Sequence, residues 1–178
     1  PISGGPMRAT SGELAIMVGG EREVFERCLP ILQAMGTNIT YIGTSGSGEV
    51  VKLCNNLAIS VIALANLEAL ALGVANGVPA ETVRDVLLGA TASNYQLQNW
   101  LAQTVFTGEY DKGFAAALLA KDLAAVMDTA RESGVGLPAA ALAQQLWVRQ
   151  KQLNPQQDYT AIATFYEDML GRVLRSQA

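Results

Sequence analysis

One long apolar stretch, residues 48–76, constrains the fold of this chain more than any other feature. Leu, Ala and Ile occur on nearly every face of a helix over these residues, which would be roughly 40 Å long. A helix that is apolar all round lies at the centre of a bundle or crosses a membrane. Polar residues interrupt the stretch, and its longest uninterrupted piece, residues 57–65, is too short to cross a bilayer. We therefore expect the central helix of a helical domain, and no membrane partner.

Beyond this stretch, residues that typically begin or end helices occur at the spacing of a helical bundle. Gly77 ends the long helix, Pro79 opens the next one, and Pro138 and Asp158 are suited to begin two later helices. Aromatic residues are only 6% of the chain while Ala and Leu are abundant, which favours packed helices over a β-sandwich. Five further helices are predicted, over residues 80–88, 94–106, 115–133, 138–152 and 159–173.

The N-terminal stretch has the pattern of an α/β sheet instead. Short apolar runs that end at glycines predict buried strands, and one longer segment has helical periodicity. The strands are predicted at Pro1-Ile2, 14–18 and 38–42, and the helix over 21–35. Because these elements make a poor domain alone, we expect the last strands of a Rossmann-type domain in residues 1–43 and an all-α domain in residues 44–178.

Composition excludes several classes of function. The net charge is −4 and no basic cluster occurs, so we expect no nucleic-acid partner. The chain has no histidine, which removes His triads, His-ligated zinc and His acid/base chemistry, and we expect no metal site. Cys28 and Cys54 form no C-x-x-C pair, which fits a reduced, cytoplasmic protein. Proton transfer must then use Lys, Tyr, Cys, Asp or Glu.

Lys52 is the first candidate for proton transfer. It lies in the first turns of the long helix, and Asn55 and Asn56, three and four residues later, share its face. Burial and the positive end of the helix dipole both disfavour an ammonium group, so we expect the pKa of Lys52 to be lowered. Such an amine can donate and accept a proton, and the two amides can hold a hydroxyl or carboxylate. Spacing alone equally allows a lysine that reaches solvent beside capping asparagines.

Two glycine-rich segments are candidate ligand sites. Ser3-Gly4-Gly5 follows a predicted strand, where its N–H groups and hydroxyl would suit a carboxylate, although an ordinary turn explains it more simply. Residues 43–49 join a strand to the long helix. They are not a P-loop, because Glu49 stands where a lysine is required, and not a dinucleotide fingerprint, because Val51 replaces the third glycine. This segment is most simply a junction between domains.

Taken in order, these segments resemble those of the β-hydroxyacid dehydrogenase family, to which 3-hydroxyisobutyrate dehydrogenase and tartronate semialdehyde reductase belong and to which 6-phosphogluconate dehydrogenase is more distantly related. A third segment, near residue 120, also resembles that family, although by itself it would be interpreted only as a solvated Lys-Asp pair. The matching motifs are Pro1-Ile2-Ser3-Gly4-Gly5 with Ala9 and Gly12-Glu13-Leu14, then Gly46-Ser47-Gly48 with Lys52 and Asn55-Asn56, then Gly113-Phe114 with Lys121-Asp122-Leu123.

The resemblance implies a fold and an activity. The fold is mainly α, a multi-helical domain on one long interdomain helix, preceded by the last strands of a Rossmann-type domain. The activity is the NAD- or NADP-dependent interconversion of a small β-hydroxy acid and its semialdehyde or keto form, in a homodimer or higher homo-oligomer formed through the helical domain.

It also implies roles for single residues. Lys52 would be the general acid/base, and Lys121 would contact the cofactor from the helical domain. The substrate would be bound by Ser3, Gly4, Gly5, Asn55 and Asn56, and Gly48 would permit close packing at the cofactor and substrate site.

The chain lacks the glycine-rich nucleotide fingerprint of that family. We therefore expect it to be the C-terminal portion of a longer enzyme and to have no dehydrogenase activity alone. Two alternatives stay open. An imine reductase on the same scaffold is disfavoured, because its lysine position usually holds another residue. A non-catalytic helical oligomerisation module would explain the apolar helix but would not require Lys52 and the two asparagines on one face.

Overall fold

The computed structural model of the protein describes residues 1–175 and divides the chain into two compact units. The first unit is Pro1–Ala58 and the second begins at Ile59. One helix, α3, contributes its first turns to the first unit and its remainder to the second. The protein is mainly helical with one small sheet, as the sequence predicts.

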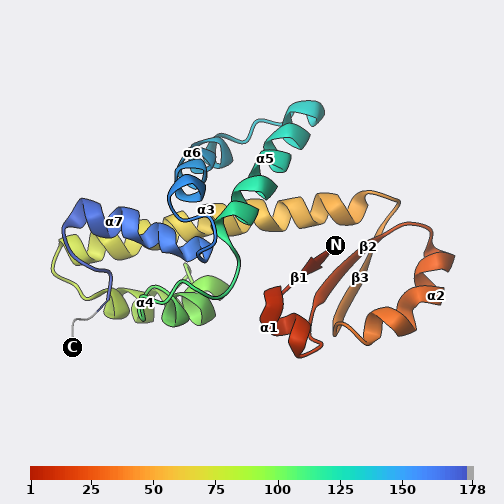
Figure 1. Ribbon diagram of the computed structural model, residues 1–178, viewed down its shortest axis with the longest axis horizontal. Coiled ribbons are helices and arrows are strands. Elements are labelled where there is room, and N and C mark those ends of the chain that lie inside the picture. The colour runs from red at the N-terminus through yellow and green to blue at the C-terminus, as the bar shows by residue number, and fades with distance from the viewer. Residues whose placement is uncertain (176–178) are drawn as a thin grey trace. The chain divides into compact units, whose positions relative to one another are not determined.

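The sheet of the first unit has three strands in the order β1-β2-β3. β1 pairs antiparallel with β2, and β2 pairs parallel with β3. The helix α2 connects the two parallel strands, as a parallel pair requires (Figure 1). All three predicted strands and the predicted helix are confirmed, with bounds β1 Ile2–Ser3, β2 Ala15–Gly19, α2 Arg22–Gln33 and β3 Asn38–Gly43.

A short helix after β1, α1 (Gly5–Thr10), is absent from the sequence-based prediction. The helix is not predicted because two glycines stand at its start and glycine disfavours helix interiors. Gly4 precedes the helix with φ +133, a conformation that residues with a side chain rarely adopt, and a Cβ there would meet the Arg8 side chain at 2.7 Å. The expected sharp turn at Ser3-Gly4-Gly5 is therefore present, and it leads directly into α1.

The long helix is α3 (Ser47–Ala75), 29 residues, as predicted. Its second half belongs to the core of the second unit, in which Ala63, Leu67 and Leu70 are fully buried. By length and composition, α3 is the one helix within residues 1–175 that could cross a membrane, a test that the core helix of a soluble protein also passes. Burial against other helices gives part of its apolar surface a partner within the chain.

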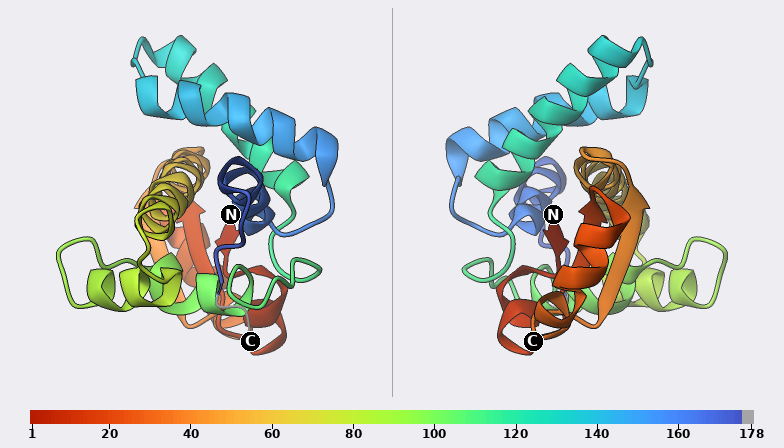
Figure 2. Two further views of the ribbon diagram at one scale, coloured as in Figure 1. Left: turned by 90° about the vertical axis from the view of Figure 1, so that its left-hand side faces the viewer. Right: turned by 90° about the vertical axis from the view of Figure 1, so that its right-hand side faces the viewer.

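The second unit packs its helices around one hydrophobic core. Figure 2 shows α5 and α6 side by side as a helical hairpin. Gly134, in the left-handed conformation, ends α5, and Pro138 begins α6. Trp147 is fully buried with leucines of α3 and α5, and each such side chain contributes about 1.5–3 kcal/mol by leaving water. The helices are α4 Ala80–Leu88, α5 Ala116–Ser133, α6 Pro138–Leu153 and α7 Ala163–Leu170.

Two predicted helices differ in the structure. Residues 94–106 form no regular α-helix but a π-helical turn, Gln96–Trp100, and a 3₁₀ turn, Leu101–Gln103. The Asn94 Oδ1 accepts the N–H groups of two following residues, so a side chain sets the start of this segment. The last predicted helix, residues 159–173, is too long. It begins as a 3₁₀ turn, Tyr159–Ile162, and Gly171 ends α7 with φ +66.

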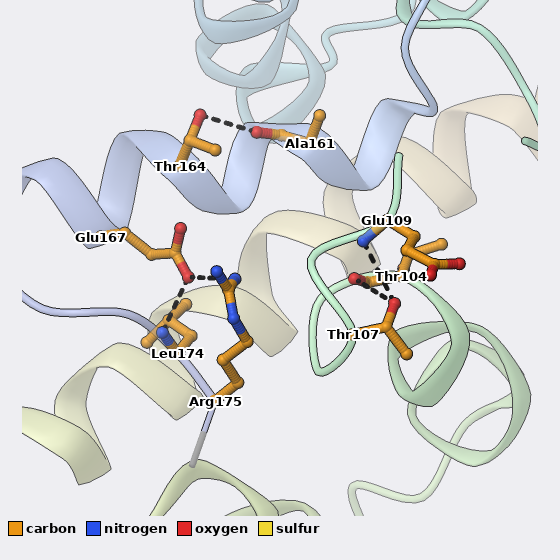
Figure 3. A network of polar contacts seen from close by, with 8 residues as sticks. All are labelled: Thr104, Thr107, Glu109, Ala161, Thr164, Glu167, Leu174 and Arg175. Carbon is orange, nitrogen blue, oxygen red and sulfur yellow. Dashed lines mark hydrogen bonds and ion pairs between the residues drawn. The ribbon is translucent and has the colours of Figure 1, made fainter. Parts of the chain in front are cut away.

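The chain after α7 folds back onto the loop that precedes α5. Figure 3 shows Glu167 of α7 facing this segment, where its carboxylate accepts the N–H of Leu174 at 2.8 Å and lies 3.7 Å from the Arg175 guanidinium. Arg175 in turn lies against Gly108, where a Cβ would come within 2.8 Å of its Nη1. Thr107 stabilises the same loop by accepting the N–H of Glu109.

Candidate active site

The N-terminal end of α3 lies close to the backbone of β2 and to the ring of Pro1. A Cβ on Gly48 would lie 2.7 Å from the carbonyl oxygen of Met17 and 3.0 Å from Cδ of Pro1. A Cβ on Gly19, at the end of β2, would likewise lie 3.0 Å from the Gly48 N. The two glycines therefore permit the helix to begin directly against the sheet.

Lys52 follows one turn later. Its side chain is half-buried. Of its two neighbours in the chain, Val51 is exposed and Leu53 is half-buried. β1 and the first turns of α3 both run from right to left in Figure 1, and both begin beside Pro1, which contacts Gly48. The Lys52 and Ser3-Gly4-Gly5 segments thus belong to one unit and extend from one starting point.

Asn55 and Asn56 form a hydrogen-bonded pair. The Asn55 Nδ2 donates to the Asn56 Oδ1 at 3.0 Å. Asn56 is almost fully buried, at 1% exposed, while Asn55 is half-buried. The side-chain amide of Asn56 carries N–H donors of the kind that contact a hydroxyl or carboxylate oxygen.

Lys121 lies in the second unit, one and a half turns into α5. Its side chain is 68% exposed, and its Nζ forms an ion pair of 2.8 Å with the adjacent Asp122. An exposed pair of this kind contributes little to stability. The location agrees with the solvated Lys-Asp pair of the sequence-based interpretation, and it leaves an accessible cation on the surface of the helical unit.

Asp158 is a functional candidate that the sequence shows only as an N-cap. Its carboxylate does cap the 3₁₀ turn by accepting the N–H of Thr160 at 3.0 Å. It also accepts hydrogen bonds from Trp100 and Phe114, which lie 58 and 44 residues away in the chain. Burial raises the pKa of this carboxyl, and the hydrogen bonds from Thr160, Phe114 and Trp100 oppose that shift. No sequence signal connects residues this far apart.

The described residues fit only one part of a nicotinamide dinucleotide. The cation of Lys121 suits the hydroxyl and phosphate oxygens of such a ligand. The turn from Gly46 to Gly48 lacks the third glycine of a dinucleotide fingerprint, because Val51 stands there, so it supplies no pyrophosphate site of that kind. Within residues 1–175, no three His, Cys, Asp or Glu residues lie close enough together to hold a metal ion.

Comparison with known proteins identifies two sequence families along the chain. Residues 46–166 match the family described as the NAD-binding domain of NADP-dependent 3-hydroxyisobutyrate dehydrogenase, and residues 1–43 match the NAD-binding domain of 6-phosphogluconate dehydrogenase. Among curated relatives, the NAD-dependent L-serine dehydrogenase of Pseudomonas aeruginosa is 33% identical over 97% of this chain. The 2-(hydroxymethyl)glutarate dehydrogenase of Eubacterium barkeri is also 33% identical, over 96%.

Solved structures agree with the sequence matches. The 3-hydroxyisobutyrate dehydrogenase of Mycobacterium tuberculosis, solved with L-serine, is 30% identical and superposes with a TM-score of 0.83 over 93% of this chain and 59% of its own. The chain spans 60% and 57% of the lengths of the two curated relatives. The resemblance predicted from the three motifs is confirmed: the chain belongs to the β-hydroxyacid dehydrogenase family, a family of oxidoreductases that use NAD or NADP.

Proposed function

We propose that the chain supplies the proton-transfer and substrate-binding groups of an NAD- or NADP-dependent enzyme that oxidises a small β-hydroxy acid to its semialdehyde or keto form. The observation that carries the proposal is the location of Lys52 one helical turn beyond Gly48, which contacts Pro1 at the start of the strand that leads to Ser3. Family membership supports the class of reaction.

Segment lengths support a shared site for Lys52 and the Ser3-Gly4-Gly5 turn. Along α3, Lys52 lies about 6 Å beyond Gly48 and Asn56 about 12 Å beyond it, at 1.5 Å per residue. Ser3 ends β1, two residues beyond Pro1, and after the turn at Gly4 the chain begins α1 at Gly5. Both segments belong to the first unit, and Gly48 packs against Pro1, which supports a shared site for them.

The proposed chemistry divides the oxidation between the chain and the cofactor. Ser3 and the N–H groups after it bind the substrate carboxylate, and Asn56, oriented by Asn55, donates to the substrate oxygens. Neutral Lys52 accepts the proton of the β-hydroxyl as the C–H bond breaks and the carbonyl forms. A bound nicotinamide would supply the hydride-acceptor chemistry for that carbon. Reduction uses the same groups, with protonated Lys52 returning the proton.

The names of the relatives indicate the substrate class. L-serine, 3-hydroxyisobutyrate and 2-(hydroxymethyl)glutarate, named in the relatives' activities, share a carboxylate with a primary hydroxyl on the β-carbon. We propose that this pair of groups is what the site recognises. Glutarate derivatives, 3-hydroxyisobutyrate and serine, with NAD and NADP, make the informative substrate panel.

The cofactor's main contacts lie outside the groups described above. Lys121 is proposed to contact it from the helical unit, and Gly48 to act by letting α3 begin against the sheet. Because the 178 residues contain no glycine-rich dinucleotide fingerprint, the chain alone is expected to show no turnover. Turnover of any of the panel substrates by the isolated chain would contradict this.

Substitution of Lys52 tests the proposal directly. In the protein at its full natural length, Lys52→Ala is expected to lower kcat by about a thousandfold, the usual range for loss of a general acid/base, with cofactor affinity retained. The matched control is Lys151→Ala, an exposed lysine on α6. If Lys52→Ala turns over substrate at the wild-type rate, Lys52 does not have the proposed role. If the wild-type protein turns over none of the substrates, the proposed function is wrong.

A homodimer, or a higher homo-oligomer, and a cytoplasmic location complete the proposal. Large apolar side chains such as Leu72 on α3 and Leu142 on α6 are exposed, and both cysteines are free thiols. Light scattering of the protein at its full natural length at micromolar concentration is expected to give at least twice the mass of one chain. A monomer mass would contradict the oligomer.

A further inference from the structure

Asp158 joins three segments of the second unit. Its Oδ1 accepts hydrogen bonds from the Trp100 Nε1 at 3.1 Å and from both the backbone N and the hydroxyl of Thr160. Its Oδ2 accepts the backbone N–H of Phe114 at 2.8 Å. The carboxylate is 1% exposed and receives only donors, so an ionised acceptor with two oxygens is what this position requires.

Because Gly113 has no side chain, the Asp158 carboxylate can reach the backbone N–H of Phe114. Gly113 has φ +113, and a Cβ there would come within 2.7 Å of Trp100 Cζ2 and closer still to Asp158 Oδ2. The Gly113-Phe114 pair, one of the three family motifs, is therefore explained by Asp158: the glycine leaves room for the carboxylate and the next residue donates to it.

The chain around Asp158 also completes the N-terminal end of α5. The first N–H groups of a helix have no partner within the helix. In α5 the N–H of Ala116 donates to the Gln157 carbonyl at 2.8 Å, and that of Ala117 donates to the Pro155 carbonyl at 3.0 Å. Two further backbone bonds, Asp158 to Tyr110 and Tyr159 to Phe114, fix this segment against the loop before the helix. The start of α5 is thus held by residues 155–159.

We propose that Asp158 is a positioning residue, which fixes the N-terminal end of α5 and through it the location of Lys121. Lys121 lies five residues, about 7.5 Å, along the same helix, so a shift of the helix start moves its amine. The proposal rests on the proposed function, in which Lys121 contacts the cofactor. It adds that the affinity of that contact depends on a buried carboxylate from the far end of the chain.

A double-mutant cycle with Asp158→Asn and Lys121→Ala tests the proposal in the protein at its full natural length. An amide offers one acceptor where the carboxylate offers two, so Asp158→Asn must turn a donor toward an existing donor. The Kd of NADH or NADPH, whichever binds the wild type, is measured by titration calorimetry. Asp158→Asn is expected to raise it about tenfold, and by less than about twofold in the Lys121→Ala background.

Hydrogen exchange supplies a readout that needs no cofactor. In Asp158→Asn the Phe114 and Ala116 amides are expected to exchange about tenfold faster, while Ala130 near the other end of α5 is unchanged. Asp128→Asn, an exposed carboxylate on α5, is the matched control and should change neither exchange nor Kd. If Asp158→Asn does not fold, Trp100→Phe removes one donor and is expected to raise Kd about threefold, again only while Lys121 is present.

The outcomes separate this inference from the proposed function. Equal increases in Kd with and without Lys121 overturn the inference, because Asp158 would then act independently of that lysine. So does an unchanged Kd in Asp158→Asn, or in Lys121→Ala alone. In each of these cases, turnover of a β-hydroxy acid by the wild type leaves the proposed reaction standing. Absence of both turnover and dinucleotide binding in the wild type removes both.

Discussion

The two units of the chain differ in how much apolar surface each buries by itself. Leucines of several helices and Trp147 form one core in the second unit, whereas among residues 1–58, all described, Leu14 and Ile16 are the only buried hydrophobic side chains. In α2, Val24 and Ile31 are 50% and 67% exposed. Since apolar burial is the main favourable contribution to folding, the second unit has much the stronger means of stabilising itself.

This difference in apolar burial shows which residues of the candidate site lie in the less stabilised unit. Lys52, Asn56 and the Ser3-Gly4-Gly5 turn belong to the sparsely buried unit, while Lys121 belongs to the well-packed one. The first unit positions its residues with glycines that let backbones meet, such as Gly48. The second positions its lysine with a buried core and a buried carboxylate.

Alkaline pH should affect the second unit most strongly. Burial raises the pKa values of Tyr110, Tyr159 and Tyr166 above the ordinary value of about 10. Above that pH the unfolded chain releases three protons that the folded chain keeps, so the unfolded state is favoured as pH rises. Their stability contribution is complete below pH 10 and is lost at about 4 kcal/mol per pH unit above it. Urea unfolding at pH 9, 10 and 11 measures this slope.

Tyr110→Phe is the control for that slope. The Tyr110 hydroxyl is buried and has no hydrogen-bond partner among the described residues, so its removal should cost little at pH 7. It should reduce the alkaline slope by about one third, because one of three protons is no longer released. A slope that Tyr110→Phe leaves unchanged would show that these buried phenols do not control alkaline stability.

Truncations of one apolar side chain in each unit sharpen the comparison further. Leu67→Ala in the core of the second unit is expected to lower the free energy of unfolding by about 3 kcal/mol, through lost burial and the cavity left behind. Ile31→Ala on the exposed face of α2 is expected to lower it by less than about 0.5 kcal/mol. Equal losses in urea unfolding would break the comparison between the units.

An effect smaller than that of Leu67→Ala is expected at the start of α3. Gly48→Ala should destabilise the first unit by about 2 kcal/mol, since the new Cβ would lie 2.7 Å from a strand carbonyl that cannot easily move. Gly136→Ala is the control, because no atom lies within 4 Å of its new Cβ. Native-state hydrogen exchange of the β2 and β3 amides measures the effect. Unchanged protection in Gly48→Ala would mean that the helix and sheet tolerate separation.

Elements with long, regular patterns could be predicted from the sequence. The apolar run of α3, the glycine-bounded strands and the proline-started helices α4 and α6 have nearly the predicted bounds, because local propensity and tertiary packing agree there. The three motifs also sufficed for the family. The segment α1 was missed because its first residue is a glycine, which local propensity assigns to a turn.

Segments controlled by distant side chains could not be predicted. Residues 94–106 have helical periodicity, yet the Asn94 side chain engages the first N–H groups and Trp100 is held by Asp158. The Asn94 contacts are those of an ordinary helix N-cap, whereas the Trp100–Asp158 hydrogen bond is a long-range contact that local periodicity does not contain. The wider role of Asp158 was hidden for the same reason, since its partners are distant in sequence and one of them is a backbone N–H that any residue could supply.

The location of the two tryptophans makes the helical unit visible on its own. Trp147 is fully buried in its core and Trp100 donates to Asp158, while residues 1–58 contain no tryptophan. Intrinsic tryptophan fluorescence therefore does not report on the environment of the strands or of Lys52. An emission shift that lags behind the loss of circular dichroism during denaturation would reveal a partly melted state in which the sheet is already gone.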